Sequence, residues 1–360
     1  MSSDKSFDFD EFLASDFAAV GEALIKRCMK MQGRRLYLSG ATGFFGKNLL
    51  SLLAYLARQG ATFGVTALSR SPERFLAEQS WSRNLAWLDW QAGDVGSPWP
   101  GEGRYDYVIH AATETAADFH RDKLNVFEQI LSGTRNSMAF AAAHGVRRVL
   151  LTGSGAQYGA IPADFAAGVP ESSPNACDPS RPNSAYGEAK RAGEMLAALH
   201  GQKHGIDIIN TRCFAFVGPG LPLDAHFAIG NFIGDALRGT PIQLATGGDA
   251  MRSYLYGADL AVWLLLLLIE ADNGSVVNVG SGHAISILDL AGRVRDVVSP
   301  RLQVRPGENV EGSERHYYVP CVARAKALGL DVWTDLDRAI ERTALWHRIR
   351  APGLGPEMQS

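Results

Sequence analysis

Short apolar runs alternate with longer stretches of helical periodicity from residue 34 onward. Short runs of this kind favour strands, whereas apolar residues that recur every three or four positions favour helices. We expect strands at residues 35–39, 64–68, 85–90, 107–111, 148–152, 207–212 and 276–279. We expect helices at residues 47–58, 124–143 and 185–204. Strand and helix units that alternate in this way predict an α/β fold with a doubly wound parallel sheet of about seven strands.

The alternation of strands and helices loosens after Arg212, where the sequence VGPGLPL is rich in glycine and proline. Such residues indicate that the chain leaves the sheet. A chain of 360 residues is longer than chains that normally fold around a single hydrophobic core, so we expect one large domain and one smaller domain. The predicted parts are an N-terminal extension (1–33), a sheet domain (34–213 and 254–281), a smaller C-terminal α/β domain (214–253 and 282–347) and a tail (348–360).

The N-terminal extension contains one candidate helix. Its apolar positions are Phe17, Val20, Leu24 and Ile25. Ser15 or Asp16 would cap this helix, and Gly33 would end it. We expect the extension to pack on the body of the protein as a strap, with a contact in a dimer as the alternative.

Composition narrows the class of protein. The net charge of -3, from 35 basic and 38 acidic residues, and the lack of a long basic run argue against a nucleic-acid partner. No cysteine pair has CxxC spacing, so we expect neither a metal site nor a disulfide framework. The acidic start, MSSDKSFDFDEF, does not resemble an export signal, and the apolar stretch at 261–269 is too short to cross a bilayer. We therefore expect a cytoplasmic protein without a membrane partner.

A glycine-rich loop, SGATGFFG, joins the first predicted strand to the first predicted helix. Glycines let the backbone turn tightly beside a pyrophosphate, and the helix directs free N–H groups at the phosphates. The spacing GxxGxxG resembles the extended short-chain dehydrogenase/reductase family, in its NAD-dependent epimerase/dehydratase branch that modifies nucleotide sugars. The resemblance implies a Rossmann-type NAD(P)-binding sheet domain, a substrate-binding smaller domain and a homodimer. The implied cofactor contacts in the loop are Gly40, Thr42, Gly43, Phe44, Phe45 and Gly46.

Ser69 and Arg70 follow the second strand, where an NAD enzyme commonly offers an acidic side chain to the ribose 2′-hydroxyl. Ser69 can hydrogen-bond a 2′-phosphate and Arg70 can pair with it. This pair favours NADP(H). The alternative is that Arg70 lies against the adenine of either cofactor.

Further segments resemble cofactor contacts of the same family. Asp94 and Val95 resemble a pair that contacts adenine, and the sequence HAAT places three small residues after the fourth strand. His110, which begins that sequence, is expected to pack locally. The implied contacts are Asp94, Val95, Ala111, Ala112, Thr113 and, after the sixth strand, Phe214.

Tyr186 and Lys190 form the pattern YxxxK on a predicted helix, where a spacing of four places both on one face. A phenol with a pKa of about 10 is a poor base at neutral pH. The Lys190 ammonium and the positive nicotinamide ring would lower that pKa. The segment TGSGAQYG resembles the family's S-S-x-x-V-Y-G, which makes Ser154 the catalytic hydroxyl and leaves Tyr158 as a structural residue or a sugar contact.

Two small residues narrow the reaction. Gly155 and Ala156 stand where sugar 4,6-dehydratases of the family carry an Asp-Glu pair, and decarboxylases carry a Glu in place of Ala156. Gly155 also stands where the fucose-synthase type carries a cysteine. The implied reaction is hydride transfer at one sugar carbon, by a 4-ketoreductase or a 4-epimerase, and Arg70 favours the reductase. The alternatives are an NADPH-dependent reductase of a small carbonyl and a non-catalytic dinucleotide-binding scaffold.

Candidate substrate contacts lie in the smaller domain. Arg252 precedes SYLYGAD, which resembles the family's R-x-F-x-Y-V-x-D, and Arg315 resembles a second contact to the substrate diphosphate. A guanidinium binds pairs of phosphate oxygens well; the alternative is that both arginines are surface residues. Asn231 is a third candidate contact. We expect His226 to pack in the substrate loop, with an acid or base as its alternative role.

Overall fold

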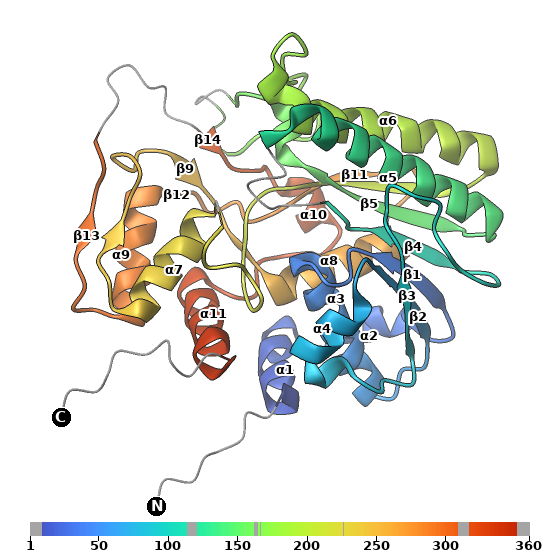
Figure 1. Cartoon of the computed structure of the whole chain (residues 1–360), viewed down its shortest axis with the longest axis horizontal. Helices are drawn as coiled ribbons and strands as arrows, with labels where there is room; N and C mark the ends of the chain where they lie inside the picture. The colour runs from blue at the N-terminus through green and yellow to red at the C-terminus, as the bar shows by residue number, and fades with distance from the viewer. Residues whose placement is uncertain are drawn as a thin grey trace, which may run out of the picture.

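The computed structural model describes residues 9–113, 121–161, 165, 167–225, 227–308 and 317–350. At its centre lies a parallel sheet of seven strands (Figure 1). In order across the sheet these are β11 (Val276–Val279), β6 (Asp207–Cys213), β5 (Arg148–Ser154), β4 (Tyr107–His110), β1 (Arg35–Ser39), β2 (Gly64–Ser69) and β3 (Leu88–Ala92). Because the order proceeds outward from β1 in both directions, the predicted doubly wound fold is confirmed.

Helices cover both faces of the sheet (Figure 1). α3 (Phe44–Arg58) and α8 (Gly257–Glu270) pack together on one face, and α5 (Lys123–Ala143) and α6 (Ala185–His204) on the other. Strand β1 shows why two layers are needed. Leu36 and Leu38 belong to the core under α3 and α8, while Tyr37 between them belongs to the core under α5.

Two predicted boundaries are wrong by three residues, and the other differences are smaller. The third strand was expected at 85–90, but residues 85–87 form a turn in which the Leu88 N–H donates to the Leu85 carbonyl at 2.9 Å. The first helix was expected from Lys47, but α3 begins at Phe44. The second difference brings part of the glycine-rich loop into the first turn of the helix.

The N-terminal extension forms two helices, so the prediction of one helix capped by Ser15 or Asp16 is wrong. α1 (Phe9–Phe17) contains both residues, and α2 (Glu22–Cys28) follows a break at Gly21, whose φ of 85° ends regular helix. α1 packs on α3, and α2 packs on α8. The Asp16 carboxylate also accepts a hydrogen bond from Arg342 Nε at 2.7 Å. The described part of the extension therefore packs on the body, as expected of a strap.

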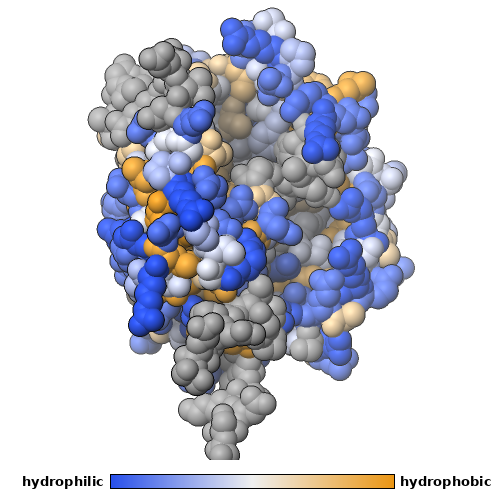
Figure 2. Space-filling view, turned by 60° about the vertical axis from the view of Figure 1, so that its left-hand side comes forward, coloured by the Kyte–Doolittle hydropathy of each residue, from blue (hydrophilic) through white to orange (hydrophobic). Residues whose placement is uncertain are grey.

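The C-terminal region is built from short pieces. α7 (Ala228–Arg238), α9 (Ile287–Val298) and α11 (Leu336–Arg350) pack against one another. Strands of two residues complete it: β7 (Phe216–Val217) with β10 (Leu255–Tyr256), β8 (Ile242–Gln243) with β13 (Val304–Arg305), and β9 (Met251–Arg252) between β12 (Ile285–Ser286) and β14 (Tyr317–Tyr318). α4 (Pro72–Glu78) and α10 (Ala323–Ala327) are short connecting helices. On the face drawn in Figure 2, hydrophilic residues predominate.

A buried polar joint links α8 to the C-terminal region. Asp259, in the first turn of α8, accepts hydrogen bonds from the backbone N–H groups of Trp333 and Thr334, both at 3.0 Å, and from the Thr334 hydroxyl at 3.1 Å. Burial raises the pKa of Asp259 to about 7, against these hydrogen bonds, and raises that of Asp16 to about 6.

Among the helices in the described part of the chain, none combines the length and the apolar character needed to cross a bilayer. Within the same residues, no group of His, Cys, Asp and Glu side chains is arranged to hold a metal ion.

Candidate active site

The glycine-rich loop lies at the carboxyl ends of β1 and β4, which are paired through Ser39 and His110. Gly40 has a φ of 76°, and a Cβ on it would lie 2.7 Å from the backbone of Ala111 and Ala112. A Cβ on Gly46 would lie 2.3 Å from the Gly40 carbonyl oxygen. The fold of the loop therefore requires glycine at these two positions, because any side chain would collide with neighbouring backbone atoms. The loop thereby packs against the predicted cofactor segment 111–113.

Gly43 differs from the other two glycines. A Cβ on it would meet only the Gly40 oxygen, at 3.4 Å, and the residue is exposed at the N-cap of α3 without a side-chain cap. Thr42 beside it is half-buried, and Phe44, Phe45 and Gly46 form the first turn of the helix. An uncapped helix N-terminus with open space above a glycine suits a phosphate, so these residues fit the pyrophosphate of NAD(P).

The predicted adenosine contacts lie at the ends of the neighbouring strands β2 and β3. The Ser69 hydroxyl accepts a hydrogen bond from the Ser71 N–H at 3.2 Å, and Arg70 is exposed. The Asp94 carboxylate accepts one from the Gly96 N–H at 2.7 Å, and Val95 is half-buried. Ser69 and Asp94 thus stabilise the turns that follow their strands, while the Arg70 side chain lies at the surface.

His110 packs locally, as expected. Its Nδ1 lies 2.7 Å from the Ser39 hydroxyl, and burial lowers its pKa to about 3. A neutral imidazole buried between the ends of β1 and β4 is a packing group rather than a base that faces a substrate.

The structure brings the three predicted catalytic residues together. Ser154 ends β5, and Tyr186 and Lys190 lie on the first turns of α6. The Ser154 side chain lies close enough to Tyr186 to oppose the effect of burial on the pKa of Tyr186. The Lys190 ammonium donates to the Thr113 hydroxyl at 2.6 Å and to the Thr152 carbonyl at 2.7 Å. The predicted cofactor residue Thr113 is therefore in direct contact with the predicted catalytic residue Lys190.

Burial is the main cause of the shifted pKa values of Tyr186 and Lys190. It raises the pKa of Tyr186 to about 12, although the hydrogen bond from Ser154 acts in the opposite direction, and it lowers the pKa of Lys190 to about 8. The expected lowering of the Tyr186 pKa by the ammonium is not seen, because Lys190, with a pKa of about 8, has already lost its charge at the pH at which Tyr186 would ionise. The chain alone therefore keeps Tyr186 as a neutral phenol at pH 7.

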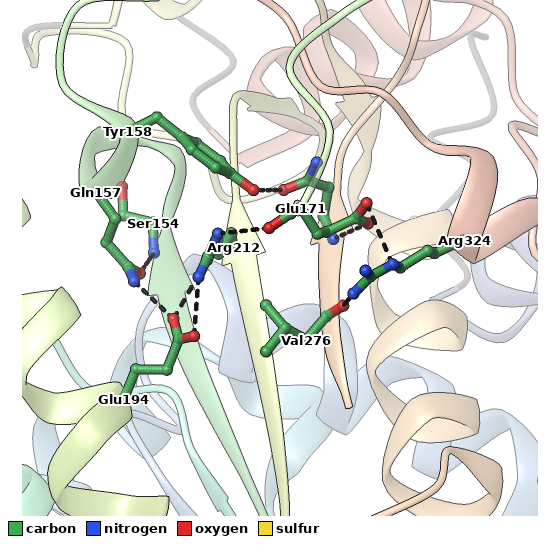
Figure 3. Close-up of polar contacts among 9 residues, drawn as sticks. Ser154, Gln157, Tyr158, Glu171, Glu194, Arg212, Val276 and Arg324 are labelled. Carbon is green, nitrogen blue, oxygen red and sulfur yellow. Dashed lines mark hydrogen bonds and ion pairs between the residues drawn. The ribbon is translucent and has the colours of Figure 1, made fainter. Parts of the chain in front are cut away.

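A polar network behind Ser154 fixes it to α6 (Figure 3). The Ser154 N–H donates to Gln157 Oε1 at 3.0 Å, and Gln157 Nε2 donates to Glu194 at 2.7 Å. Arg212 Nη2 donates to the other oxygen of Glu194 at 2.9 Å. Glu194 follows Lys190 by four residues, so one face of α6 presents Tyr186, Lys190 and Glu194 in succession. Sequence reasoning missed Glu194 and Gln157, although that spacing was a signal for Glu194.

The same network extends to the C-terminal region (Figure 3). The Tyr158 hydroxyl donates to Asn278 Oδ1 at 2.8 Å, and the Asn278 N–H donates to Glu171 at 2.9 Å. Glu171 pairs with Arg324 at 3.7 Å. The Arg212 guanidinium lies 4.9 Å from the centre of the Tyr158 ring. Tyr158 is therefore a buried structural residue, one of the two roles expected of it.

Tyr186 lines an open pocket of about 850 Å³, which falls within the usual size range of small-molecule sites. Tyr318 of β14, which sequence reasoning missed, lines the same pocket. A Cβ on Gly155 would lie 2.8 Å from both the Tyr318 hydroxyl and the Phe214 ring. Phe214, a predicted cofactor contact, is thus buried beside Gly155 and packs on Tyr318 with ring centroids 4.7 Å apart.

Of the predicted substrate residues, the structure describes two and places one of them near the predicted catalytic residues. Arg252 lies in β9, with its guanidinium 5.6 Å from the centre of the Tyr318 ring, which brings it to the edge of the catalytic group. Asn231 is half-buried in the first part of α7. Arg315 and His226 lie outside the described residues.

Comparison with known proteins agrees with this architecture. The model of the NAD dependent epimerase/dehydratase family matches residues 36–280. UDP-glucuronic acid decarboxylase 5 of Arabidopsis thaliana is 26% identical over 293 residues, which cover 81% of this chain and 82% of the relative. dTDP-glucose 4,6-dehydratase of Streptomyces griseus is 26% identical over 323 residues, with coverage of 87% and 93%. The crystal structure of Thermus thermophilus UDP-glucose 4-epimerase in complex with NAD has a TM-score of 0.71 and 20% identity, with coverage of 87% and 99%.

The fold and the arrangement at the carboxyl edge of the sheet define a Rossmann-type enzyme of the extended short-chain dehydrogenase/reductase class. The chain belongs to the NAD dependent epimerase/dehydratase family, whose members among its relatives modify nucleotide sugars.

Proposed function

We propose that this protein is an NAD(P)-dependent oxidoreductase of a nucleotide-diphosphosugar that transfers hydride at one sugar carbon, as a 4-epimerase or a 4-ketoreductase. One observation carries the proposal: Tyr186 faces a pocket whose described lining contains no Asp or Glu. Tyr186 thus provides one group that can donate and accept a proton at the reacting oxygen, whereas the described lining offers no carboxyl group to remove a second proton from the sugar.

The sequence relatives include decarboxylases and 4,6-dehydratases, so the choice between reactions depends on two positions. Gly155 and Ala156 carry no carboxyl group. At position 155 the room for one is also gone, because Phe214 and Tyr318 occupy it. These two observations support hydride and proton exchange without elimination of water or carbon dioxide.

Each catalytic residue then has a distinct task. Tyr186 exchanges a proton with the reacting sugar oxygen, and Ser154 donates a hydrogen bond to that oxygen. Lys190, held by Thr113 and Thr152, keeps a positive charge below pH about 8 close to the site. A bound nicotinamide would accept or deliver the hydride, and the positive charge of its oxidised form would favour the Tyr186 phenolate. Arg252 and Asn231 are assigned to the substrate, on the substrate-binding part of the chain at 214–253 and 282–347.

For the cofactor we propose NADP(H), since Ser69 and Arg70 end β2 without an acidic side chain. The related epimerase structure holds NAD, so the preference is a property to be measured on this chain. We further propose a homodimer. Three apolar side chains on α5 and α6 support it because they are strongly exposed: Leu124 (67%), Met195 (62%) and Leu199 (56%).

The test is a reaction series with UDP- and dTDP-hexoses and NAD⁺ or NADP⁺, followed by cofactor absorbance and by NMR of the sugar. The proposal predicts a 4-epimer or a 4-keto sugar that keeps all its carbon and oxygen atoms. Release of water or carbon dioxide, or no hydride transfer with any nucleotide sugar, would overturn it. Mass analysis of the cofactor that co-purifies separates the two forms: tightly held NAD(H) supports the epimerase, and uptake of NADPH with a 4-keto sugar supports the reductase.

A further inference from the structure

Gln157 is a buried amide directly behind the predicted catalytic serine. It is 3% exposed and lies in a short 3₁₀ helix, Gly155–Tyr158, that follows Ser154 at the end of β5. In the family's S-S-x-x-V-Y-G pattern, valine stands at the position of Gln157, and the first serine stands at the position of Gly153. Because a valine side chain makes no hydrogen bond, the polar contacts of Gln157 are an addition of this chain to the pattern.

The two ends of the Gln157 amide bind different elements of the fold (Figure 3). Oε1 accepts a hydrogen bond from the Ser154 N–H at 3.0 Å, and Nε2 donates one to Glu194 at 2.7 Å. Glu194 lies on α6 and is itself held by Arg212, whose Nη2 donates to its other oxygen at 2.9 Å. One side chain therefore ties the end of β5 to the helix that carries Tyr186.

Two glycines give this tie its room. A Cβ on Gly153 would lie 2.6 Å from Gln157 Oε1 and 2.5 Å from the Thr211 carbonyl oxygen. A Cβ on Gly187, in the first turn of α6, would lie 2.6 Å from the Ala156 carbonyl oxygen. The Gln157 amide thus fills space that a side chain at position 153 would take, and α6 packs closely on the backbone of the 3₁₀ helix.

The bond to Gln157 fixes the backbone from which the Ser154 hydroxyl projects. Ser154 has extended backbone angles, and its hydroxyl accepts a hydrogen bond from the Ala156 N–H at 3.1 Å. Together with the bond from the Ser154 N–H to Gln157, this contact forms a capping box. A serine hydroxyl has two lone pairs and one proton, so one lone pair and the proton remain for a reacting oxygen.

We propose that Gln157 is a positioning residue of this site, which holds Ser154 in a fixed place relative to α6 by joining the Ser154 N–H to Glu194. This inference rests on the proposed function, in which Ser154 donates a hydrogen bond to the reacting sugar oxygen while Tyr186 exchanges a proton with it. Both groups must reach the same atom, so a small displacement of Ser154 relative to Tyr186 slows the reaction more than it weakens substrate binding.

The first test is Gln157→Met, which keeps the length of the side chain and removes both hydrogen bonds. We expect kcat to fall roughly tenfold, while KM for the nucleotide sugar changes by less than about threefold. Gln79→Met is the matched control, because Gln79 is also a buried glutamine but has Trp81 and Arg350 as its partners. It should leave kcat unchanged, and thermal unfolding of both variants shows whether they are folded.

The second test is Gln157→Glu, which keeps an acceptor for the Ser154 N–H and places a second carboxyl group against Glu194. Two facing carboxylates repel each other, so kcat relative to the wild type should fall as the pH rises and the second carboxyl ionises. A side chain that only fills space would give no such pH dependence, since Glu and Gln have nearly the same shape. If the wild type is active and both Gln157 variants keep its kcat at every pH, the role of Gln157 is wrong and the proposed function stands.

A third readout does not depend on turnover. In protein labelled with ¹⁵N-serine, the Ser154 amide signal is assigned by its loss in Ser154→Ala. Its hydrogen exchange should be roughly tenfold faster in Gln157→Met and unchanged in Gln79→Met. If no nucleotide sugar reacts but the exchange accelerates, the proposed function fails and the tie between Ser154 and Glu194 stands. Unchanged exchange in Gln157→Met would overturn the tie, whatever the reaction.

Discussion

The sheet region and the C-terminal region of this molecule are specified in different ways. Strands of the sheet have four to seven residues, most of them contain a short apolar run, and β1 and β11 occupy the residues expected from the pattern. The strands of the C-terminal region have two residues each, and the group at β9, β12 and β14 joins pieces from 251–252, 285–286 and 317–318. Local periodicity therefore determines the first region, and contacts between distant segments determine the second.

The two regions also differ in the kind of group they offer. The cofactor side presents backbone N–H groups and glycines around α3, together with Lys190 in contact with Thr113. The other side presents bulky or charged side chains, above all Tyr318 and Arg252. The family model ends at residue 280, so Tyr318 lies beyond the part of the chain that it describes. We infer that the sheet region carries the shared chemistry and that the C-terminal region adapts it to one substrate.

The largest expected effect is a loss of turnover at Tyr186, which lies where the two regions meet. Tyr186→Phe removes the proton donor and should lower kcat roughly 10³-fold, the size expected when a general acid–base is lost. The measurement is steady-state turnover, with thermal unfolding as the control for folding. A variant that keeps more than about a tenth of the wild-type activity would remove Tyr186 from the mechanism.

Two alanine substitutions in the glycine-rich loop sharpen the account of the cofactor side. Gly46→Ala places a Cβ 2.3 Å from the Gly40 oxygen, and we expect it to lower the free energy of unfolding by about 3 kcal/mol. Gly43→Ala has room for its methyl group and should cost less than about 1 kcal/mol. It should nevertheless weaken NAD(P) binding roughly tenfold, because the methyl group occupies the space for the phosphate.

For both variants, denaturant unfolding measures the loss of stability, and cofactor titration measures the affinity for NAD(P). Equal loss of stability in the two variants, or unchanged NAD(P) affinity in Gly43→Ala, would contradict the assignment of the loop.

The joint at Asp259 predicts a pH dependence of stability. Its folded pKa of about 7 exceeds 3.8, the ordinary value of an aspartate carboxyl, so the folded state is favoured at low pH and loses stability as the pH rises between these values. Asp259→Asn mimics the neutral acid. Between pH about 5.5 and about 7, the wild type should lose about 2 kcal/mol relative to the variant, as each unit corresponds to about 1.4 kcal/mol.

Denaturant unfolding of the wild type and Asp259→Asn over this pH range shows whether the relative stability of the wild type falls or rises with pH. A wild type that gains stability relative to Asp259→Asn as the pH rises would show that the folded protein favours the ionised carboxyl.

Arg252→Met tests the substrate side directly. Loss of the guanidinium should raise KM for the nucleotide sugar roughly 30-fold and leave the Kd of NAD(P) within about twofold. Arg305→Met is the control, since Arg305 is an exposed arginine of β13 in the same region. If both variants behave alike, Arg252 is a surface residue.

The smallest effect is expected at the end of β2. Arg70→Asp should shift the ratio of kcat/KM for NADPH over NADH roughly tenfold toward NADH, because a carboxylate repels the 2′-phosphate. Parallel assays with both cofactors measure the shift. An unchanged ratio would mean that Arg70 does not contact the ribose.

Prediction of the sheet from the sequence succeeded because its determinants are local. The glycine-rich loop, YxxxK and the segment around Ser154 are contiguous motifs, and the parallel sheet brings their ends to one edge. The single helix expected near residue 16 failed because Gly21 adopts a left-handed conformation that ends it, which the apolar spacing did not reveal. Tyr318 could not be found because its contact with the Cys213 carbonyl joins residues 105 positions apart.

The central claim is hydride transfer at one sugar carbon without loss of any atom from the sugar. The most direct test uses UDP- and dTDP-hexoses deuterated at C4, with NMR and mass spectrometry of the product. The account predicts that deuterium returns to C4 in an epimerised sugar, or remains on the reduced cofactor beside a 4-keto sugar. Deuterium at a different carbon together with loss of water, or loss of carbon dioxide from a UDP-glucuronate, would contradict it.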